Sequence, residues 1–322
     1  SDIKLNNKIR LSKAMSIIVL AIIIALVIAY IPMLGIFSML AAVPYVIIGA
    51  ITDRKYSLIS ILVTFCVLIL FADISYALNI CIMYSLPGIV IGKMLKRSFE
   101  QEDSNKFEPI YGGTIIFVLS MLVYFFVLKT FLNVNLLDEV SKMISEIVNI
   151  QKNSFSATEL KVFDKMKPDE IVSYFTNMLP MMLFLQGLLS AFVTYYLSVF
   201  FIKRITKMNI RFPKFADFYL PGNAILTTFL LYLLVLFIQI IGSKLYTELI
   251  MTNLQLVFNL MFVIQGIAVC IYFLKKWIRQ GPNKIMFFSG IILCLFGFMG
   301  ISFVGMVDSI IDFRKVRSYK ST

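Results

Sequence analysis

The 322-residue sequence contains no histidine, one tryptophan and four cysteines, and only 15% of its residues are charged. The cysteines lie singly in apolar runs, with no pair at the spacing of metal ligands (Cys66, Cys81, Cys270 and Cys294). Zinc sites draw mainly on histidine and paired cysteine, so we expect no metal and no other cofactor. The scarcity of charge also excludes an ordinary soluble domain, in which about 25% of residues are charged.

Catalytic patterns are equally scarce. A histidine-free intramembrane hydrolase needs a serine with a lysine, or paired aspartates, deep in facing helices. Asp73, Asp308 and Asp312 all lie near the ends of apolar runs instead. The segment GPNK, residues 281–284, is too short for a phosphate-binding loop and follows no strand. We therefore expect no catalytic residues and no enzymatic activity.

Apolar residues dominate what remains, with 60% hydrophobic residues and a mean hydropathy of +0.89. Runs of roughly 20 apolar residues, enough to cross a bilayer as a helix, recur along the chain. The sequence therefore predicts an all-α, polytopic transmembrane helical bundle of eight or nine membrane segments, with the lipid bilayer as its surroundings.

The net charge of +12 is concentrated in short basic clusters at the ends of these runs. That distribution follows the positive-inside rule and gives no stripe for nucleic acid, so no nucleic-acid partner is expected. The first apolar run, from about Ala14 to Tyr30, follows one such cluster (Lys4, Lys8, Arg10 and Lys13). We therefore expect a cytoplasmic N-terminus, and a first segment that is retained because no cleavage site follows it.

The long polar stretch in the middle of the chain suggests three parts: a transmembrane half at 1–133 with five segments, external amphipathic helices at 134–172, and a C-terminal transmembrane half at 173–322. Within the middle part, apolar residues recur at helical spacing on one face, and a second helix is expected to begin at Ser156. The apolar face comprises Leu136, Val140, Met143, Ile144, Ile147 and Val148. A helix on the outer surface, or a lid over a cavity, fits this pattern.

The last apolar run, from Ile285 to Val307, allows two topologies. Its length favours a full span, which places the basic tail that contains Arg314 outside, against the positive-inside rule. Glycines at 297 and 300 would instead permit a re-entrant hairpin that keeps the tail inside. Near the tail, Asp308 and Asp312 are expected to pair with basic residues at the interface.

The first apolar run contains AIIIALVIA, in which Ala21, Ala25 and Ala29 recur every fourth residue on one helical face. Small residues at this spacing let helices approach closely in lipid. The face either packs against another helix of the same chain or docks a separate membrane subunit.

The order of motifs around this face resembles that in the S components of bacterial energy-coupling factor (ECF) transporters. AIIIALVIA is followed by IPMLG, by a proline-bearing second segment with Pro44, by the charged turn TDRK and by SLPGIVIGKMLKR. In that family, which has six helices, an alanine motif on the first helix meets the shared coupling subunit. The resemblance implies an S-component-like N-terminal part, with Ala21, Ala25 and Ala29 docking an ECF coupling subunit and its ATPases.

Three later stretches resemble the YybS-like family of bacterial membrane proteins: FPKFADFYLPGNA, VFNLMFVIQGIAVCIYFLKK and GFMGISFVGMVDSIIDFRK. This resemblance implies a multi-pass protein of the bacterial cytoplasmic membrane and no established activity. Its members tend to be encoded near a membrane-bound cyclic-dinucleotide phosphodiesterase, which suggests a signalling enzyme as a partner.

Polar side chains within membrane segments are costly and usually face the interior of a bundle or a cavity. They either bond between helices or line a small-molecule cavity below the external helices. The candidates for such a lining are Asp73, Asn79, Gln186, Gln255 and Asn259. Pro44, Pro87 and Pro180 interrupt helices, as residues near transporter binding sites often do.

These features support two hypotheses. The first is a membrane-embedded subunit that binds an unknown small molecule or takes part in its transport, and that docks a partner through the alanine face. The second is a non-transporting scaffold or regulator of a signalling enzyme, bound through the basic cytoplasmic loop that contains Lys203, Arg204, Lys207 and Arg211.

Overall fold

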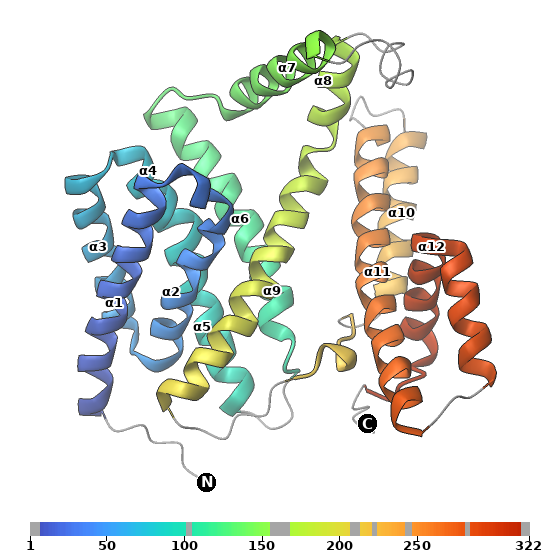
Figure 1. Ribbon diagram of the computed structural model, residues 1–322. Helices are drawn as coiled ribbons and strands as arrows, with labels where there is room; N and C mark the ends of the chain where they lie inside the picture. Colours follow the sequence, from blue (N-terminus) through green and yellow to red (C-terminus); the bar gives the residue numbers. More distant parts are fainter. Residues whose placement is uncertain are drawn as a thin grey trace. The chain divides into compact units, whose positions relative to one another are not determined.

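The computed structural model describes residues 7–100, 105–154, 168–206, 213–220, 224–241, 247–280 and 284–316. All regular elements in these ranges are helices, which confirms the predicted all-α fold (Figure 1). The chain divides into two compact units, unit 1 from Ser1 to Ile210 and unit 2 from Arg211 to Thr322, and each is described by itself. The expected helix start at Ser156, together with Lys207 and Arg211, lies outside the described residues.

Unit 1 contains six apolar segments, of which four are long and apolar enough to cross a membrane and two, Ala14–Tyr30 and Phe37–Ile51, are shorter. The six segments are α1 (Asn7–Tyr30), η1 (Pro32–Ala41) with α2 (Ala42–Ile51), α3 (Arg54–Phe71), α4 (Ile74–Asn79) with η2 (Ile80–Ser85) and α5 (Leu86–Glu100), α6 (Glu108–Phe131), and α9 (Leu179–Thr206). The amphipathic helices α7 (Leu136–Ser154) and α8 (Pro168–Asn177) lie between the fifth and sixth segments.

The boundary between the units differs from the one expected at residue 173. Helix α9 packs along α6 and also contacts α2, so it belongs to the first unit. A methyl group added at Gly187 on α9 would approach the carbonyl oxygen of Thr114 on α6 to 3.1 Å. This close helix contact follows the external segment in sequence, and hydropathy alone does not reveal it.

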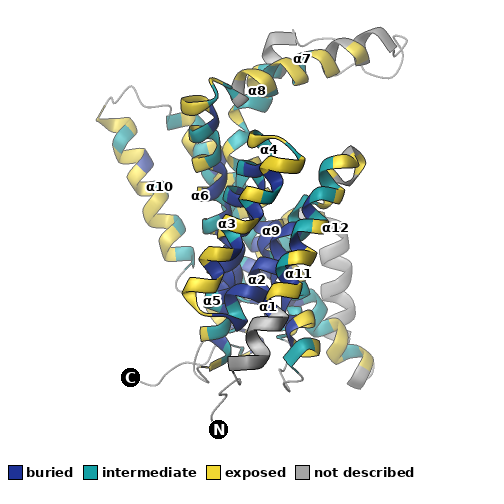
Figure 2. Cartoon of the chain, turned by 90° about the vertical axis from the view of Figure 1, so that its left-hand side faces the viewer, coloured by how far each residue is buried: buried dark blue, intermediate teal, exposed yellow. Residues whose placement is uncertain are grey.

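Helix α2 is the centre of unit 1, because nine of its ten residues are buried (Figure 2). A helix that is apolar on every face is stable only when other helices surround it, and α1, α5 and α9 all contact α2. Pro44 does not kink a long helix here. The preceding residues form the 3-10 helix η1, and Pro44 therefore lies in the first turn of α2, where its missing N–H is not needed.

The contact between α2 and α5 brings two helix backbones together. The Cα of Gly92 on α5 faces the carbonyl oxygen of Val46, and a Cβ added there would overlap that oxygen. One turn earlier, a Cβ on Gly88 would lie 2.8 Å from the carbonyl oxygen of Ala42. Because both pairs progress in the same direction, α2 and α5 run parallel, with η1 and η2 at the same end of the pair.

We predict that Gly92→Ala destabilises unit 1 by about 1–3 kcal/mol, as overpacking typically does. The added methyl group would force α5 away from α2. Thermal unfolding in detergent should show a lower midpoint for this variant. Gly35→Ala is the matched control, because nothing lies within 4 Å of a Cβ at that position. Equal midpoints for the two variants would contradict the close contact.

Unit 2 consists of η3 (Phe215–Asp217), α10 (Ala224–Ile240), α11 (Thr247–Gln280) and α12 (Lys284–Ile311). Its last helix is interrupted at Gly297, whose φ of 54° and ψ of −137° are not helical. Figure 1 shows the chain reversing its direction there, so that the second half returns toward the end from which the first half started. Each half, with 13 or 14 residues, is only about 20 Å long and too short to cross ~30 Å of hydrocarbon.

The expectation that Ile285–Val307 forms a full span is therefore wrong, and the re-entrant alternative describes α12. Gly297 permits the reversal because only glycine adopts this backbone conformation without strain. By length and composition, five of the described helices can cross a membrane. Counting the shorter apolar segments of α1, of η1 with α2, and of α10 as crossings predicts eight in all, which is the lower of the two expected numbers. An even number of crossings predicts that the two ends of the chain lie on the same side of the membrane.

This topology predicts that a side-specific reporter gives the same result at either end of the chain. Fusions of green fluorescent protein, which folds only on the cytoplasmic side, should be both fluorescent or both dark. A reporter placed in the segment between α6 and α7 provides the opposite reading as a control. Different results at the two ends would show that α12 spans the membrane.

Candidate functional site

The alanine face of α1 is packed inside unit 1. Ala21 and Ala25 are fully buried and Ala29 is half-buried, while α1 contacts η1, α2 and α3. The hydroxyl of Tyr76 on α4 donates a hydrogen bond to the carbonyl oxygen of Ala25 at 2.6 Å. The room left by the small side chains is therefore used by helices of the same chain. As a docking face for another subunit, Ala21 and Ala25 are not accessible, which corrects that interpretation.

A polar aromatic cluster forms where the two irregular helices η1 and η2 meet. We define it as Ser38, Asp73, Tyr76, Asn79, Tyr84 and Tyr124. The hydroxyl groups of Ser38 on η1 and Tyr84 on η2 lie 2.8 Å apart in a hydrogen bond. Tyr84 is buried, and the phenols of Tyr76 on α4 and of Tyr124 on α6 lie near it. The second, fourth and fifth apolar segments of unit 1, together with the connection before α4, thus contribute to one cluster.

The acidic and amide members of the cluster are held by local structure. Asp73 caps α4, because its Oδ1 accepts a hydrogen bond from the backbone N–H of Tyr76 at 2.8 Å. Asn79 is half-buried, and its Nδ2 contacts the sulfur of Met83 at 3.5 Å. The phenol of Tyr124 faces both Asn79 and Asp73. Two of the predicted lining residues, Asp73 and Asn79, are therefore brought together.

The irregular geometry of η2 has a local cause in the sequence. Pro87 has no N–H to donate, and the preceding residues, Ile80–Ser85, widen into a π-helix. The hydroxyl of Ser85 donates to the carbonyl oxygen of Ile80, five residues earlier, at 3.1 Å. Single π-helical turns often occur at functional sites, because they redirect side chains and free backbone groups.

The other predicted lining residues lie elsewhere. Gln186 is exposed on α9 of unit 1, and Gln255 and Asn259 are exposed one turn apart on α11 of unit 2. Conversely, three tyrosines and Ser38 belong to the cluster and were not singled out from the sequence. The sequence signals that pointed to this region were the polar residues Asp73 and Asn79 and the helix interruption at Pro87.

Unit 2 contains a second buried polar cluster, the Arg314 cluster, formed by Gln265, Asp308 and Arg314. The guanidinium Nη2 of Arg314 lies 2.8 Å from Asp308 Oδ2, and both side chains are almost fully buried. The same guanidinium donates to the backbone carbonyl oxygens of Ala216 and Phe218. Gln265 Nε2 donates to Asp308 Oδ2, and its Oε1 accepts from the N–H of Leu220, both at 2.9 Å.

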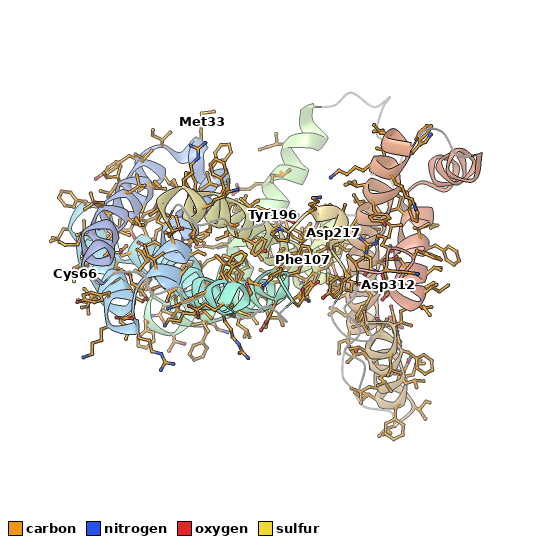
Figure 3. All side chains as sticks on the ribbon, turned by 90° about the horizontal axis from the view of Figure 1, so that it is seen from below. Met33, Cys66, Phe107, Tyr196, Asp217 and Asp312 are labelled. Atoms are coloured by element: carbon orange, nitrogen blue, oxygen red, sulfur yellow. The ribbon has the colours of Figure 1, made fainter. Side chains whose placement is uncertain are left out.

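This network joins three separate segments of unit 2: the loop around η3, the middle of α11 and the end of α12. In Figure 3, Asp217 on η3 and Asp312 after α12 mark two of these segments. The predicted pairing of Asp308 with the basic tail is confirmed, but the pair is buried rather than interfacial. Asp312 accepts a hydrogen bond from the N–H of Val316 at 3.1 Å. The Arg314 cluster therefore has a structural role, because it holds these three segments together.

We predict that Arg314→Leu destabilises unit 2 by about 3–5 kcal/mol, because it leaves the carboxylate of Asp308 buried without its partner. Thermal unfolding in detergent should show this loss. The double variant Asp308→Asn/Arg314→Leu should lose less, since it removes the unpaired charge as well. Lys315→Gln is the control at an exposed neighbour. If Arg314→Leu and the control unfold at the same temperature, the proposed structural role of the Arg314 cluster is contradicted.

Within the described residues, no group of three or more histidine, cysteine or acidic side chains is arranged to hold a metal ion. The described cysteines are separate, and Cys66 points away from the bundle (Figure 3). The polar aromatic cluster therefore offers hydrogen bonds and ring faces from its own side chains. Such an arrangement can bind and orient a small polar molecule.

Comparison with known proteins agrees with this architecture. Residues 19–309 match the family described as "Predicted membrane protein (DUF2232)". The chain is 22% identical to the "Uncharacterized protein YybS" of Bacillus subtilis (strain 168) over 243 residues, which cover 71% of each chain. No solved structure matches it. The three segments joined by the Arg314 cluster lie in the three stretches that resemble YybS-like proteins. The chain belongs to the DUF2232 family of multi-pass membrane proteins.

Proposed function

We propose that the protein binds a small polar molecule within unit 1 and serves as an S-component-like, transport-related subunit. The observation that carries this proposal is the polar aromatic cluster at the meeting of η1 and η2. Irregular helices in membrane proteins persist where protein or a water-filled cavity surrounds them, and broken helices form many transporter binding sites. The six crossings of unit 1 also equal the number that the resemblance to S components implies.

The chemistry of the cluster limits the kind of ligand. Hydroxyls of Ser38, Tyr84 and Tyr124 both donate and accept, Asn79 adds an amide, and Asp73 adds a carboxylate next to aromatic rings. Ligand sites typically combine a largely apolar wall with a few such polar groups. A carboxylate beside tyrosine rings favours a neutral or cationic ligand over an anion.

The distribution of charged residues indicates how the chain is oriented in the membrane. Basic clusters lie at the start of α1, directly after α2 and in the last turns of α5 and α9, whereas the opposite end carries the mixed-charge segment of α7 and α8. By the positive-inside rule, the N-terminus is cytoplasmic in the bacterial cytoplasmic membrane, and the cluster lies toward the outer side. An ATP-driven step would then require a partner that supplies the ATPase. Such a partner would dock on a surface other than the buried alanine face.

The test is purification of the full chain from native membranes in mild detergent, followed by mass spectrometry of retained small molecules. Asn79→Leu and Tyr124→Phe each remove polar groups of the cluster and should reduce retention about tenfold, which corresponds to roughly 1.4 kcal/mol. Gln186→Leu is the matched control, because this amide is exposed and outside the cluster. The control should retain as much ligand as the unmodified protein.

Two outcomes would contradict the proposal. One is that no small molecule is enriched over an unrelated membrane protein purified in the same way. The other is equal retention by the cluster variants and the control. If a signalling enzyme co-purifies without any small molecule, and is lost when exposed Lys203 and Arg204 are changed to Gln, the scaffold function replaces the proposed one.

A further inference from the structure

Exposed aromatic side chains mark one boundary of the membrane on unit 1. Tyr30, Phe71 and Phe131 end α1, α3 and α6, and their exposed fractions are 69%, 59% and 74%. These helices are the first, third and fifth crossings, so their ends lie on the same side. The hydroxyl of Tyr30 donates to the carbonyl oxygen of Phe71, which holds two of these ends together. Tyrosine at this position is typical of the interface between lipid and water, and the exposed rings of Phe71 and Phe131 add apolar surface beside it.

The helix α7 is held near this boundary by α6, which precedes it, and by α8, which contacts it. It begins five residues after Phe131, and α8, which contacts it, leads directly into α9. Figure 1 shows α7 lying across the end of the bundle rather than along it. Tyr174 of α8 is 53% exposed and adds another aromatic residue near the start of α9. The position of α7 is therefore at the level of the aromatic boundary.

One side of α7 presents an apolar stripe that no described residue covers. Met143, Ile147 and Ile150 follow one another at spacings of four and three residues, and their exposed fractions are 60%, 54% and 64%. Val140 and Ile144, next to the stripe, are half-buried. Charged residues adjoin it on the other side, where Glu139, Lys142 and Glu146 are exposed. This arrangement is that of a helix lying in an interface.

We propose that α7 is an interfacial helix whose stripe of Met143, Ile147 and Ile150 inserts into the lipid leaflet at the aromatic boundary. Lipid covers the stripe in this proposal, because the stripe continues the exposed aromatic surface that faces the membrane. Three acidic and two basic residues lie in α7, which leaves little net charge to attract anionic headgroups. The interaction therefore depends on burial of apolar side chains and takes place in uncharged lipid. This proposal does not depend on the function of the polar cluster.

Tryptophan fluorescence in the full chain tests it directly. The sequence has a single tryptophan, so Trp277→Phe gives a background without one. In that background, Ile147→Trp reports the stripe, Ile150→Trp reports it independently, and Lys142→Trp is the control on the charged side. Each variant is reconstituted into phosphatidylcholine vesicles that carry brominated acyl chains in both leaflets. Gel filtration in detergent before reconstitution selects folded protein.

We expect brominated lipid to quench tryptophan at positions 147 and 150 several-fold more than at position 142, and aqueous acrylamide to show the reverse order. Equal quenching at the three positions would overturn the proposal. So would shielding of positions 147 and 150 from both quenchers, because the stripe would then be covered by protein, as in a closed lid.

Discussion

The parallel contact between α2 and α5 is the constraint on which unit 1 depends. Glycines at 88 and 92 allow the two backbones to touch, and helix packing in lipid relies on such contacts because there is little hydrophobic drive between helices. Since η1 precedes α2 and η2 precedes α5, the same contact brings the two irregular helices together. The hydrogen bond between Ser38 and Tyr84 and the rest of the polar aromatic cluster follow from it.

The two units satisfy their buried polar groups in different ways. In unit 1, small hydroxyls bond to nearby groups, as when Thr64 bonds to Tyr45 at 2.7 Å and to the carbonyl oxygen of Ser60 at 2.8 Å. Unit 2 instead uses a buried ion pair, to which Gln265 and backbone carbonyl groups add hydrogen bonds, while Oδ1 of Asp308 has no hydrogen-bond partner among the described residues. The first arrangement consists of short local bonds, while the second holds three chain segments in one geometry.

Hydropathy and charge predicted most of the fold because membrane crossings need long apolar runs with charges at their ends. The pairing of Asp308 with the basic tail also followed from residues close in sequence. The reversal at Gly297 depends on one backbone conformation, and a glycine in an apolar run does not indicate which conformation it takes. Likewise, the spacing of Ala21 and Ala25 predicts a close neighbour but not whether that neighbour belongs to the same chain. The tyrosines of the cluster resemble ordinary membrane aromatics until tertiary contacts bring them to Asn79.

The central claim is that the meeting of η1 and η2 forms a binding site. The most direct measurement is a cryo-electron microscopy map of the chain purified from native membranes in mild detergent. The account predicts density for a bound small molecule in contact with Asn79 and Tyr124, with Ser38 and Tyr84 still bonded beside it. A map in which these side chains pack only against one another, with no added density, would contradict it.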